Sequence, residues 1–264
     1  MLRRFIYLNS TAVRQYTSMI DNGLADTSVS VRKTGRTTAG GADLKVLRGD
    51  HSRNAEDENS TTRIDTDEAR FDRLVQAAAT TPDELGWVEV VDPDTDLEDI
   101  GIGAIISWEC EIFVPQVAQM LSPSSGLGDA LAMIKAFAPA ARAMGHEVAD
   151  LPNEDEVDAL QRFTQASAGK LVLVGDDDST DWKVTGALEG DFIGGEVEGR
   201  AIVVGKVKKV LRVGSWQAIL AMPGLNLLSR EERRAQERRA PEADEEENYV
   251  AGPALVLDIL AVYI

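Results

Sequence analysis

Apolar and polar residues alternate along residues 106–112, and this period of two predicts a strand over residues 102–113 with one buried face. Ile106, Trp108, Cys110 and Ile112 occupy that face. Apolar runs bounded by Gly, Asp or Pro predict further strands over residues 3–8, 87–91, 170–174, 182–188, 201–211 and 254–264. Short turns separate the three strands between residues 170 and 211, so we expect an antiparallel meander there, with the final strand buried in the sheet.

Helical spacing of apolar residues predicts helices between these strands. Ser10 is the expected cap of a first helix that ends at Gly23, and a second helix starts near Thr66 and ends before Pro82. Further helices are expected over residues 129–144, 153–169 and 230–240, the last two because capping boxes open them. The elements together predict a single α+β domain over residues 1–264, with a C-terminal antiparallel sheet or meander and helices packed against it.

Two polar segments interrupt this pattern. Residues 25–63 are rich in Ser, Thr, Gly, Asp and Arg, and such a composition cannot bury enough apolar surface to offset its ordering entropy. We expect a long flexible loop there. Residues 229–248 combine a helix that is charged on every side with an acidic run, and we expect a solvated excursion from the domain.

Composition restricts the class of protein. The chain has 264 residues, 44% of them hydrophobic, so it can bury a sizeable core without disulfides or metals. Cys110 is the only cysteine, which fits a reducing cytoplasm. The net charge of −18 argues against nucleic-acid binding, and the apolar run 254–264 is far shorter than the roughly 20 residues that span a bilayer. The apolar run at the N-terminus stops at Asn9, too early for an export signal.

The two ends of the chain carry a resemblance. The residues that carry it at the N-terminal end are 5–9, Val13, Tyr16 and the helix end at 21–23. Those toward the C-terminal end are residues 205–207 followed by Leu211, residues 252–254 and residues 261–263. They resemble a family of uncharacterised bacterial proteins, classed as a domain of unknown function, that open with a Tyr-Leu strand and helix and close on an apolar strand ending in Tyr. The resemblance implies a shared fold and assigns no active-site residue.

Two acidic clusters are candidate metal sites. Asp92, Asp94 and Asp96 match the first ligands of a calcium-binding EF-hand loop, but Leu97 and Gly103 stand where that loop needs glycine and glutamate. We therefore interpret this cluster as an acidic turn. A second cluster, Asp176, Asp177, Asp178 and Asp181, follows a strand and could hold magnesium for phosphoryl transfer, although a hairpin turn explains the same residues more simply.

The sequence offers few candidate residues for other kinds of catalysis. His51 lies in the predicted flexible loop, and Cys110 on a buried strand face, so a dyad of Cys110 with His146 has weak support. Neither 101–103 nor 194–195 has the glycine spacing of a nucleotide-binding loop, and we expect no cofactor.

Basic and aromatic residues have structural explanations. We expect the basic residues of the loop to be solvated and those of the late strand to pair with the protein's own carboxylates. The first group is Arg32, Lys33, Arg36, Lys45, Arg48 and Arg53, and the second is Lys206, Lys208, Lys209 and Arg212. The four tryptophans, Trp87, Trp108, Trp182 and Trp216, are expected in the core.

These observations favour a non-enzymatic interaction or sensor protein of the bacterial cytoplasm. We expect a protein partner that contacts residues 25–63 or 230–247, because long polar excursions from compact domains are often functional. By analogy with other domains of unknown function, a role in phage defence or stress response is a further hypothesis. One alternative is a magnesium- or manganese-dependent hydrolase or nucleotidyl enzyme using Asp176, Asp177 and Asp178. Another is a structural protein that forms homo-oligomers.

Overall fold

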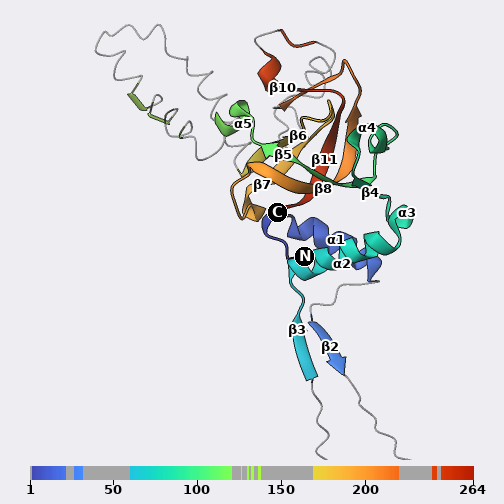
Figure 1. Cartoon of the computed structure of the whole chain (residues 1–264). Helices are drawn as coiled ribbons and strands as arrows, with labels where there is room; N and C mark the ends of the chain where they lie inside the picture. Colours follow the sequence, from blue (N-terminus) through green and yellow to red (C-terminus); the bar gives the residue numbers. More distant parts are fainter. Residues whose placement is uncertain are drawn as a thin grey trace, which may run out of the picture.

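The computed structural model describes residues 2–21, 27–31, 60–120, 126, 130, 132–133, 136–137, 169–219, 240–242 and 245–264. Figure 1 shows a body of strands with the helices α1 and α2 on one side and the short helix α5 on the other. The strands of the main sheet are β1 (Phe5–Leu8), β4 (Trp87–Val90), β5 (Ile105–Phe113), β6 (Lys170–Asp176), β7 (Lys183–Glu189), β8 (Gly199–Leu211) and β11 (Ala254–Tyr263). The α+β class predicted from the sequence is confirmed.

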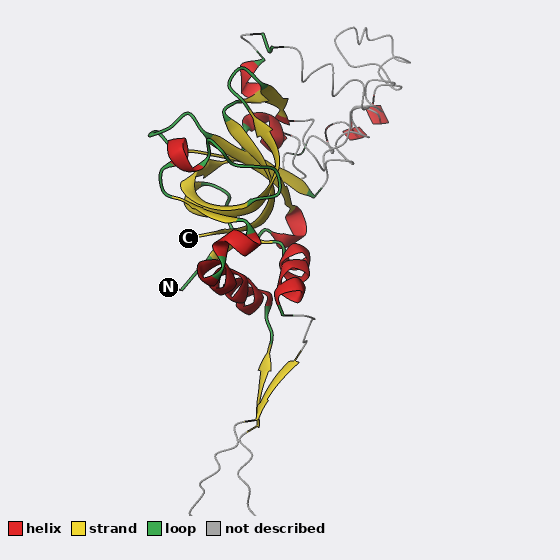
Figure 2. Cartoon of the chain, turned by 90° about the vertical axis from the view of Figure 1, so that its right-hand side faces the viewer, coloured by secondary structure: helices red, strands yellow, loops and turns green. Residues whose placement is uncertain are grey.

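Five strands close into a ring. β11 pairs with β7, β7 with β6, β6 with β5, β5 with β8, and β8 returns to β11. β8 closes the ring because it pairs with β5 along one edge and with β11 along the other. β1 and β4 are added outside the ring, on β11 and β5 respectively. The curved, closed arrangement is visible in Figure 2.

The expected meander is wrong in one connection. β6 and β7 form the predicted antiparallel hairpin, but β8 does not pair with β7. β7 pairs in parallel with the final strand, β11, which takes the neighbouring place that the meander assigned to β8. The final strand is buried within the sheet as predicted, between β7, β8 and β1.

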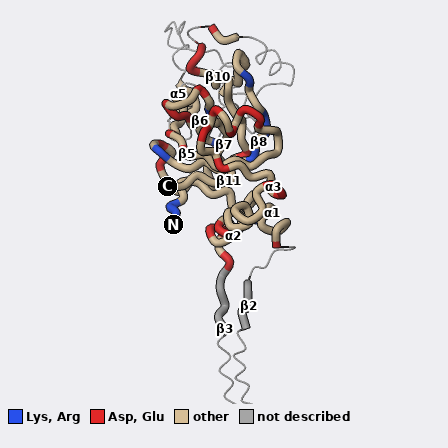
Figure 3. The backbone as a smooth tube through the Cα atoms, turned by 45° about the vertical axis from the view of Figure 1, so that its right-hand side comes forward, with Lys and Arg blue, Asp and Glu red and all other residues tan. Residues whose placement is uncertain are grey.

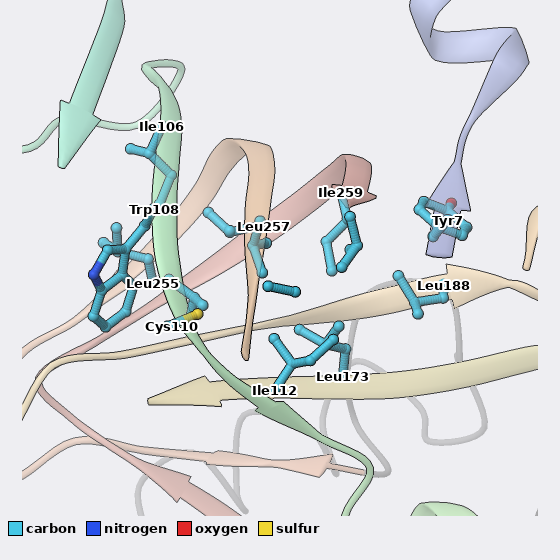
Figure 4. Packing of buried hydrophobic residues seen from close by; sticks show 14 of the residues in the cluster. Tyr7, Ile106, Trp108, Cys110, Ile112, Leu173, Leu188, Leu255, Leu257 and Ile259 are labelled. Carbon is cyan, nitrogen blue, oxygen red and sulfur yellow. The ribbon is translucent and has the colours of Figure 1, made fainter. Parts of the chain in front are cut away.

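The interior of the ring is the main hydrophobic core. Figure 4 shows side chains from β5, β6, β7 and β11 directed toward a common centre. The predicted inner face of β5, made of Ile106, Trp108, Cys110 and Ile112, is fully part of this core. The opposite face is exposed at Glu109 and Glu111 but not at Ser107, whose buried hydroxyl donates a hydrogen bond to Glu89.

Two helices cover one outer face of the ring. α1 (Ser10–Ile20) and α2 (Asp67–Thr80) pack their apolar faces on β5, β8 and β11, with Val13, Phe71 and Leu74 buried. Asn9, not the expected Ser10, caps α1 by accepting a hydrogen bond from the backbone N–H of Ala12. The last residue of α1 is Ile20, three residues before the expected end, and Gly23 itself is outside the described residues.

Thr66 caps α2 as predicted. Pro82 does not simply follow that helix, because it occupies the first turn of a further short helix, α3 (Pro82–Leu85).

The segment expected to be a loop at residues 25–63 has strands at both ends. β2 (Thr27–Val31) and β3 (Ser60–Ile64) form an antiparallel pair that extends from the α1 and α2 helices (Figure 1). Asp21 precedes β2 in the chain and Asp65 follows β3, and Arg73 joins the two by donating hydrogen bonds to both. The expectation of irregular structure is therefore wrong for these two ends, and residues 32–59 lie outside the described residues.

A second cover lies on another outer face. It consists of α5 (Gln116–Met120) and the two-stranded sheet of β9 (Trp216–Ala218) and β10 (Tyr249–Ala251), preceded by the short 3-10 helix η4 (Glu246–Asn248). These elements pack on β6, β8 and β11 around a smaller core that includes Ala118, Val172 and Val250. The predicted helices over 129–144, 153–169 and 230–240 fall outside the described residues, apart from isolated positions.

In the described part of the chain, no helix combines the length and the apolar character needed to cross a membrane.

Candidate functional site

A groove with a volume of about 530 Å³ opens between α5 and β10. Its floor is the outer face of β6 at Val174, and its walls come from α5 and from η4 and β10. Figure 1 shows α5 and β10 at the same end of the molecule. The lining residues include Phe113, Val114, Pro115, Gln116, Val117, Met120, Val174, Lys183, Ile219, Glu247, Asn248, Tyr249 and Val250. This volume lies in the range of known small-molecule and peptide side-chain pockets.

Local hydrogen bonds hold the α5 wall in place. Pro115 interrupts the chain after β5, and its carbonyl oxygen accepts from the N–H groups of Ala118 and Gln119. The Gln119 side chain donates to the Val114 carbonyl oxygen at 2.9 Å. The helix therefore presents Gln116 and Met120 outward, while Ala118 is buried in the smaller core.

The opposite wall is held by the β9 and β10 pair. Tyr249 is paired with Ala218 and Val250 with Gln217, and the buried Gln217 accepts a hydrogen bond from Lys209 at 2.9 Å. Val250 points into the smaller core, which leaves Tyr249 on the groove side with Asn248. The wall is thus a short, well-anchored strand rather than an unsupported loop.

The groove combines apolar surface with unpaired polar groups. Phe113 and Met120, which both line the groove, are exposed at 37% and 67%, large values for apolar side chains. The Lys183 ammonium and the Glu247 carboxylate have no ion-pair partner among the described residues. An apolar wall with a few free polar groups is the usual character of a binding site.

An acidic hollow of about 420 Å³ lies next to the groove. Asp176, Asp178 and Asp181 line it together with residues 251–253, which directly follow the groove residues Tyr249 and Val250. Lys183 lines both spaces and is the only cation among the described lining residues of either. The two spaces are therefore neighbours that share Lys183, one with apolar lining and the other with acidic lining.

Asp177 belongs to the predicted hairpin turn between β6 and β7, and the turn is confirmed. Its carboxylate accepts hydrogen bonds from the Ser179 hydroxyl at 2.6 Å and the Ser179 N–H at 3.0 Å. Arg200 pairs with the same carboxylate and with Glu109. The Ser179 hydrogen bonds, with a smaller contribution from Arg200, lower the pKa of Asp177.

The predicted acidic turn at residues 92–96 is also confirmed. It contains the short helix α4 (Pro93–Asp96), and the Asp96 carboxylate accepts from the N–H groups of Val91 and Asp92 at 2.8 and 2.9 Å. Asp94 accepts from the Thr180 hydroxyl, which joins this turn to the β6–β7 turn. Within the described residues, no group of three or more His, Cys, Asp or Glu side chains is arranged to hold a metal ion.

Cys110 lies in the closed interior of the ring (Figure 4), where it is fully buried. Burial raises the pKa of its thiol to about 12, so the thiolate that a nucleophile requires is strongly disfavoured. His146, the partner of Cys110 in the weakly supported dyad, and His51 are both outside the described residues.

The predicted pairing of the late basic cluster with carboxylates is confirmed for Lys208, while Lys209 donates a hydrogen bond to the Gln217 amide oxygen. Lys208 forms an ion pair with Asp258 at 2.9 Å, and Lys206 lies over the ring of Tyr16. The six basic residues of the predicted loop are outside the described residues. Among the tryptophans, Trp108 is buried, and Trp87, Trp182 and Trp216 are partly buried, which places the set at the core and its margin.

Sequence reasoning missed the groove itself. Its residues come from β5, α5, β6, β7, η4 and β10 and from the loop residues Val114, Pro115 and Ile219, and none of these segments has a motif that marks a binding surface. The one available signal is Phe113 at the end of β5, where the inward-facing alternation of apolar residues stops.

These features define a compact α+β protein with a closed ring of strands and an open lateral groove. Residues 2–263 match the family model described as Domain of unknown function (DUF6414). The chain therefore belongs to this family, in agreement with the resemblance of its two ends. No curated protein and no solved structure matches the chain.

Proposed function

We propose that this protein is a non-catalytic interaction protein of the bacterial cytoplasm and that it binds a protein partner in the groove between α5 and β10. The observation that carries the proposal is the exposure of Phe113 and Met120, two apolar side chains that line a groove of about 530 Å³. Exposed apolar surface in a concave setting is typical of protein and ligand contacts rather than of free surface.

The arrangement of the groove supports binding without chemistry. Its polar groups are an ammonium at Lys183, a carboxylate at Glu247, an amide at Asn248 and a phenol at Tyr249, spread along two walls. Such groups orient a bound segment by hydrogen bonds and charge, while the apolar wall contributes most of the affinity.

The rival enzyme hypothesis receives less support. It requires Asp177 as a metal ligand beside Asp176 and Asp178, but the Asp177 carboxylate already accepts two hydrogen bonds from Ser179 and pairs with Arg200. Metal binding by the Asp177 carboxylate would remove these hydrogen bonds and this ion pair from the turn. The interaction hypothesis makes no such demand on the carboxylates.

The groove adds a third surface to the two expected from the sequence, residues 25–63 and 229–248. Of the three surfaces, we favour the groove as the contact with the partner, because β9, β10 and α5 fix the geometry of the groove. A role in phage defence or stress response would follow from the identity of the partner.

Site-specific photo-crosslinking in the native host tests this proposal. A benzophenone amino acid replaces Gln116, which is exposed on the groove wall, and in a second strain replaces Gln76, which is exposed on α2. Figure 1 shows α2 and α5 on opposite sides of the strand ring. We expect a discrete crosslinked protein at position 116 that is missing at position 76.

Three other results have clear meanings. Equal crosslinking at both positions, or none at position 116, would refute binding at the groove. A crosslink at position 116 to a second copy of this chain would replace the partner hypothesis by self-association.

A further inference from the structure

The groove and the acidic hollow are neighbouring spaces with different chemical characters, joined at Lys183 and along residues 249–253. Phe113, Val117 and Met120 provide the apolar part, and Asp176, Asp178 and Asp181 provide the acidic part. Lys183 stands at the junction and lines both parts. Any segment long enough to fill the apolar part and continue along β10 must therefore enter the field of the aspartates.

The charge balance of the hollow is negative. Asp177 is paired with Arg200, whereas Asp176, Asp178 and Asp181 have no ion-pair partner among the described residues. These three carboxylates face the single ammonium of Lys183. Asp178 and Asp181 are exposed, so a cation of another molecule can approach them and reduce the repulsion between their carboxylates.

The other end of the groove has the same sign. Glu246 and Glu247 are exposed on η4, and Glu247 lines the groove itself. Figure 3 shows acidic stretches along the end of the molecule that carries α5 and β10. An apolar groove thus lies between two acidic edges.

On the basis of the proposed function, we infer that the partner segment is a short apolar stretch flanked by Lys or Arg, with a basic residue entering the hollow of Asp176, Asp178 and Asp181. The apolar stretch buries Phe113 and Met120, which supplies affinity through removal of apolar surface from water. The basic flanks neutralise carboxylates that lack partners, which gives orientation and excludes acidic competitors.

Selection from a library of random dodecapeptides displayed on phage tests this inference. The full-length protein is the target, and phage that also bind the Met120→Lys variant are removed. We expect the enriched peptides to contain an apolar run with Lys or Arg next to it. Binding of a synthetic winning peptide, followed by fluorescence anisotropy, should weaken about tenfold in the Asp178→Lys, Asp181→Lys double variant.

A charge exchange makes the test specific. The same peptide with its basic residues changed to Glu should bind poorly to the native protein and better to the double variant. Circular dichroism of the variants checks that they are folded, which is expected because both aspartates are exposed in the turn.

Each alternative result overturns the inference. Enriched peptides without basic residues, or a winning peptide that is indifferent to the charge reversal, would show that the groove selects apolar segments alone. The proposed function would then stand. Failure to enrich any peptide that depends on Met120 would also refute the inference, while the crosslink at position 116 decides the proposed function separately.

Discussion

The Asp65 carboxylate accepts two hydrogen bonds from the Arg73 guanidinium, at 2.6 and 2.9 Å. The same guanidinium donates to Asp21 at 3.2 Å, so one arginine of α2 joins the residue after α1 to Asp65, two residues before α2. Arg70, which is buried, adds a further hydrogen bond to Asp65 at 2.9 Å. This network fixes the two points from which the chain leaves and re-enters the body around β2 and β3.

The network makes stability depend on pH. The Arg73 hydrogen bonds, reinforced by Arg70, lower the pKa of Asp65 to about 2. Its ordinary pKa is near 3.9, so its contribution is complete above about pH 4 and is lost as pH falls toward about 2. We expect Asp65→Asn to lower the free energy of unfolding at pH 7 by roughly 2 kcal/mol, measured by urea unfolding.

The pH profile of the same variant provides the decisive comparison. The difference between the native protein and Asp65→Asn should shrink between pH 4 and pH 2, where the native carboxylate becomes protonated. Asp72→Asn is the control, because the Asp72 side chain is half exposed and, among the described residues, forms an ion pair with Arg3 alone. A difference for Asp65→Asn that stays constant with pH would contradict the account.

Gly186 tests the closure of the strand ring. It lies where β7 pairs with β11, and a methyl group on its Cα would lie 2.7 Å from the Leu257 carbonyl oxygen and 2.8 Å from the Ile259 side chain. We expect Gly186→Ala to destabilise the protein by about 1–3 kcal/mol, since the strand pair must separate to admit the methyl group. Gly101→Ala, whose methyl group would meet no atom within 4 Å, should change stability by less than about 0.5 kcal/mol. Equal effects of the two variants in urea unfolding would argue against the ring.

Substitution of Asp177 distinguishes a structural turn from the rival enzyme site. In the turn, Asp177→Ala removes the hydrogen bonds from Ser179, and we expect a loss of roughly 1 kcal/mol in unfolding free energy. Asp178→Ala serves as the control, because that exposed carboxylate holds no such hydrogen bonds among the described residues. A magnesium- or manganese-dependent activity that disappears in Asp177→Ala, with unchanged stability, would instead establish the enzyme.

Cys110 reports on the interior of the ring. Since its thiol is fully buried and burial raises its pKa to about 12, we expect it to resist Ellman's reagent at pH 8 until the protein unfolds. The free thiol of glutathione in the same solution controls for the activity of the reagent. Reaction of the folded protein at a rate similar to that of the unfolded protein would show that the ring is open.

Local pattern predicted which faces are buried but not which strands become neighbours. The alternation through Ile106, Trp108, Cys110 and Ile112 identified the inner face of β5, because side chains on a strand alternate between its two faces. That alternation does not indicate that β8 pairs with both β5 and β11. Strand pairing depends on contacts between residues far apart in the chain, so the parallel pairing of β7 with β11 replaced the expected meander.

The candidate site was less predictable than the fold. The turns around Asp96 and Asp177 could be predicted, because aspartate binds nearby backbone N–H groups within a few residues. The groove could not, because Met120 and Tyr249 become its walls only after α5 and β10 pack on the same ring face. The exposure of Met120 is a property of that packing and has no local sequence signal.

The most direct test of the groove is the effect of Met120→Lys on partner recovery. The tagged native protein, Met120→Lys and Met19→Lys are purified from the native host, and the co-purifying proteins are quantified by isotope-labelled mass spectrometry. Met19 is the matched control, because it is exposed at 76% on α1, on the other side of the ring. The account predicts that a protein recovered with the native chain and with Met19→Lys is reduced at least about tenfold with Met120→Lys. Equal recovery of every co-purifying protein with Met120→Lys and Met19→Lys would contradict it.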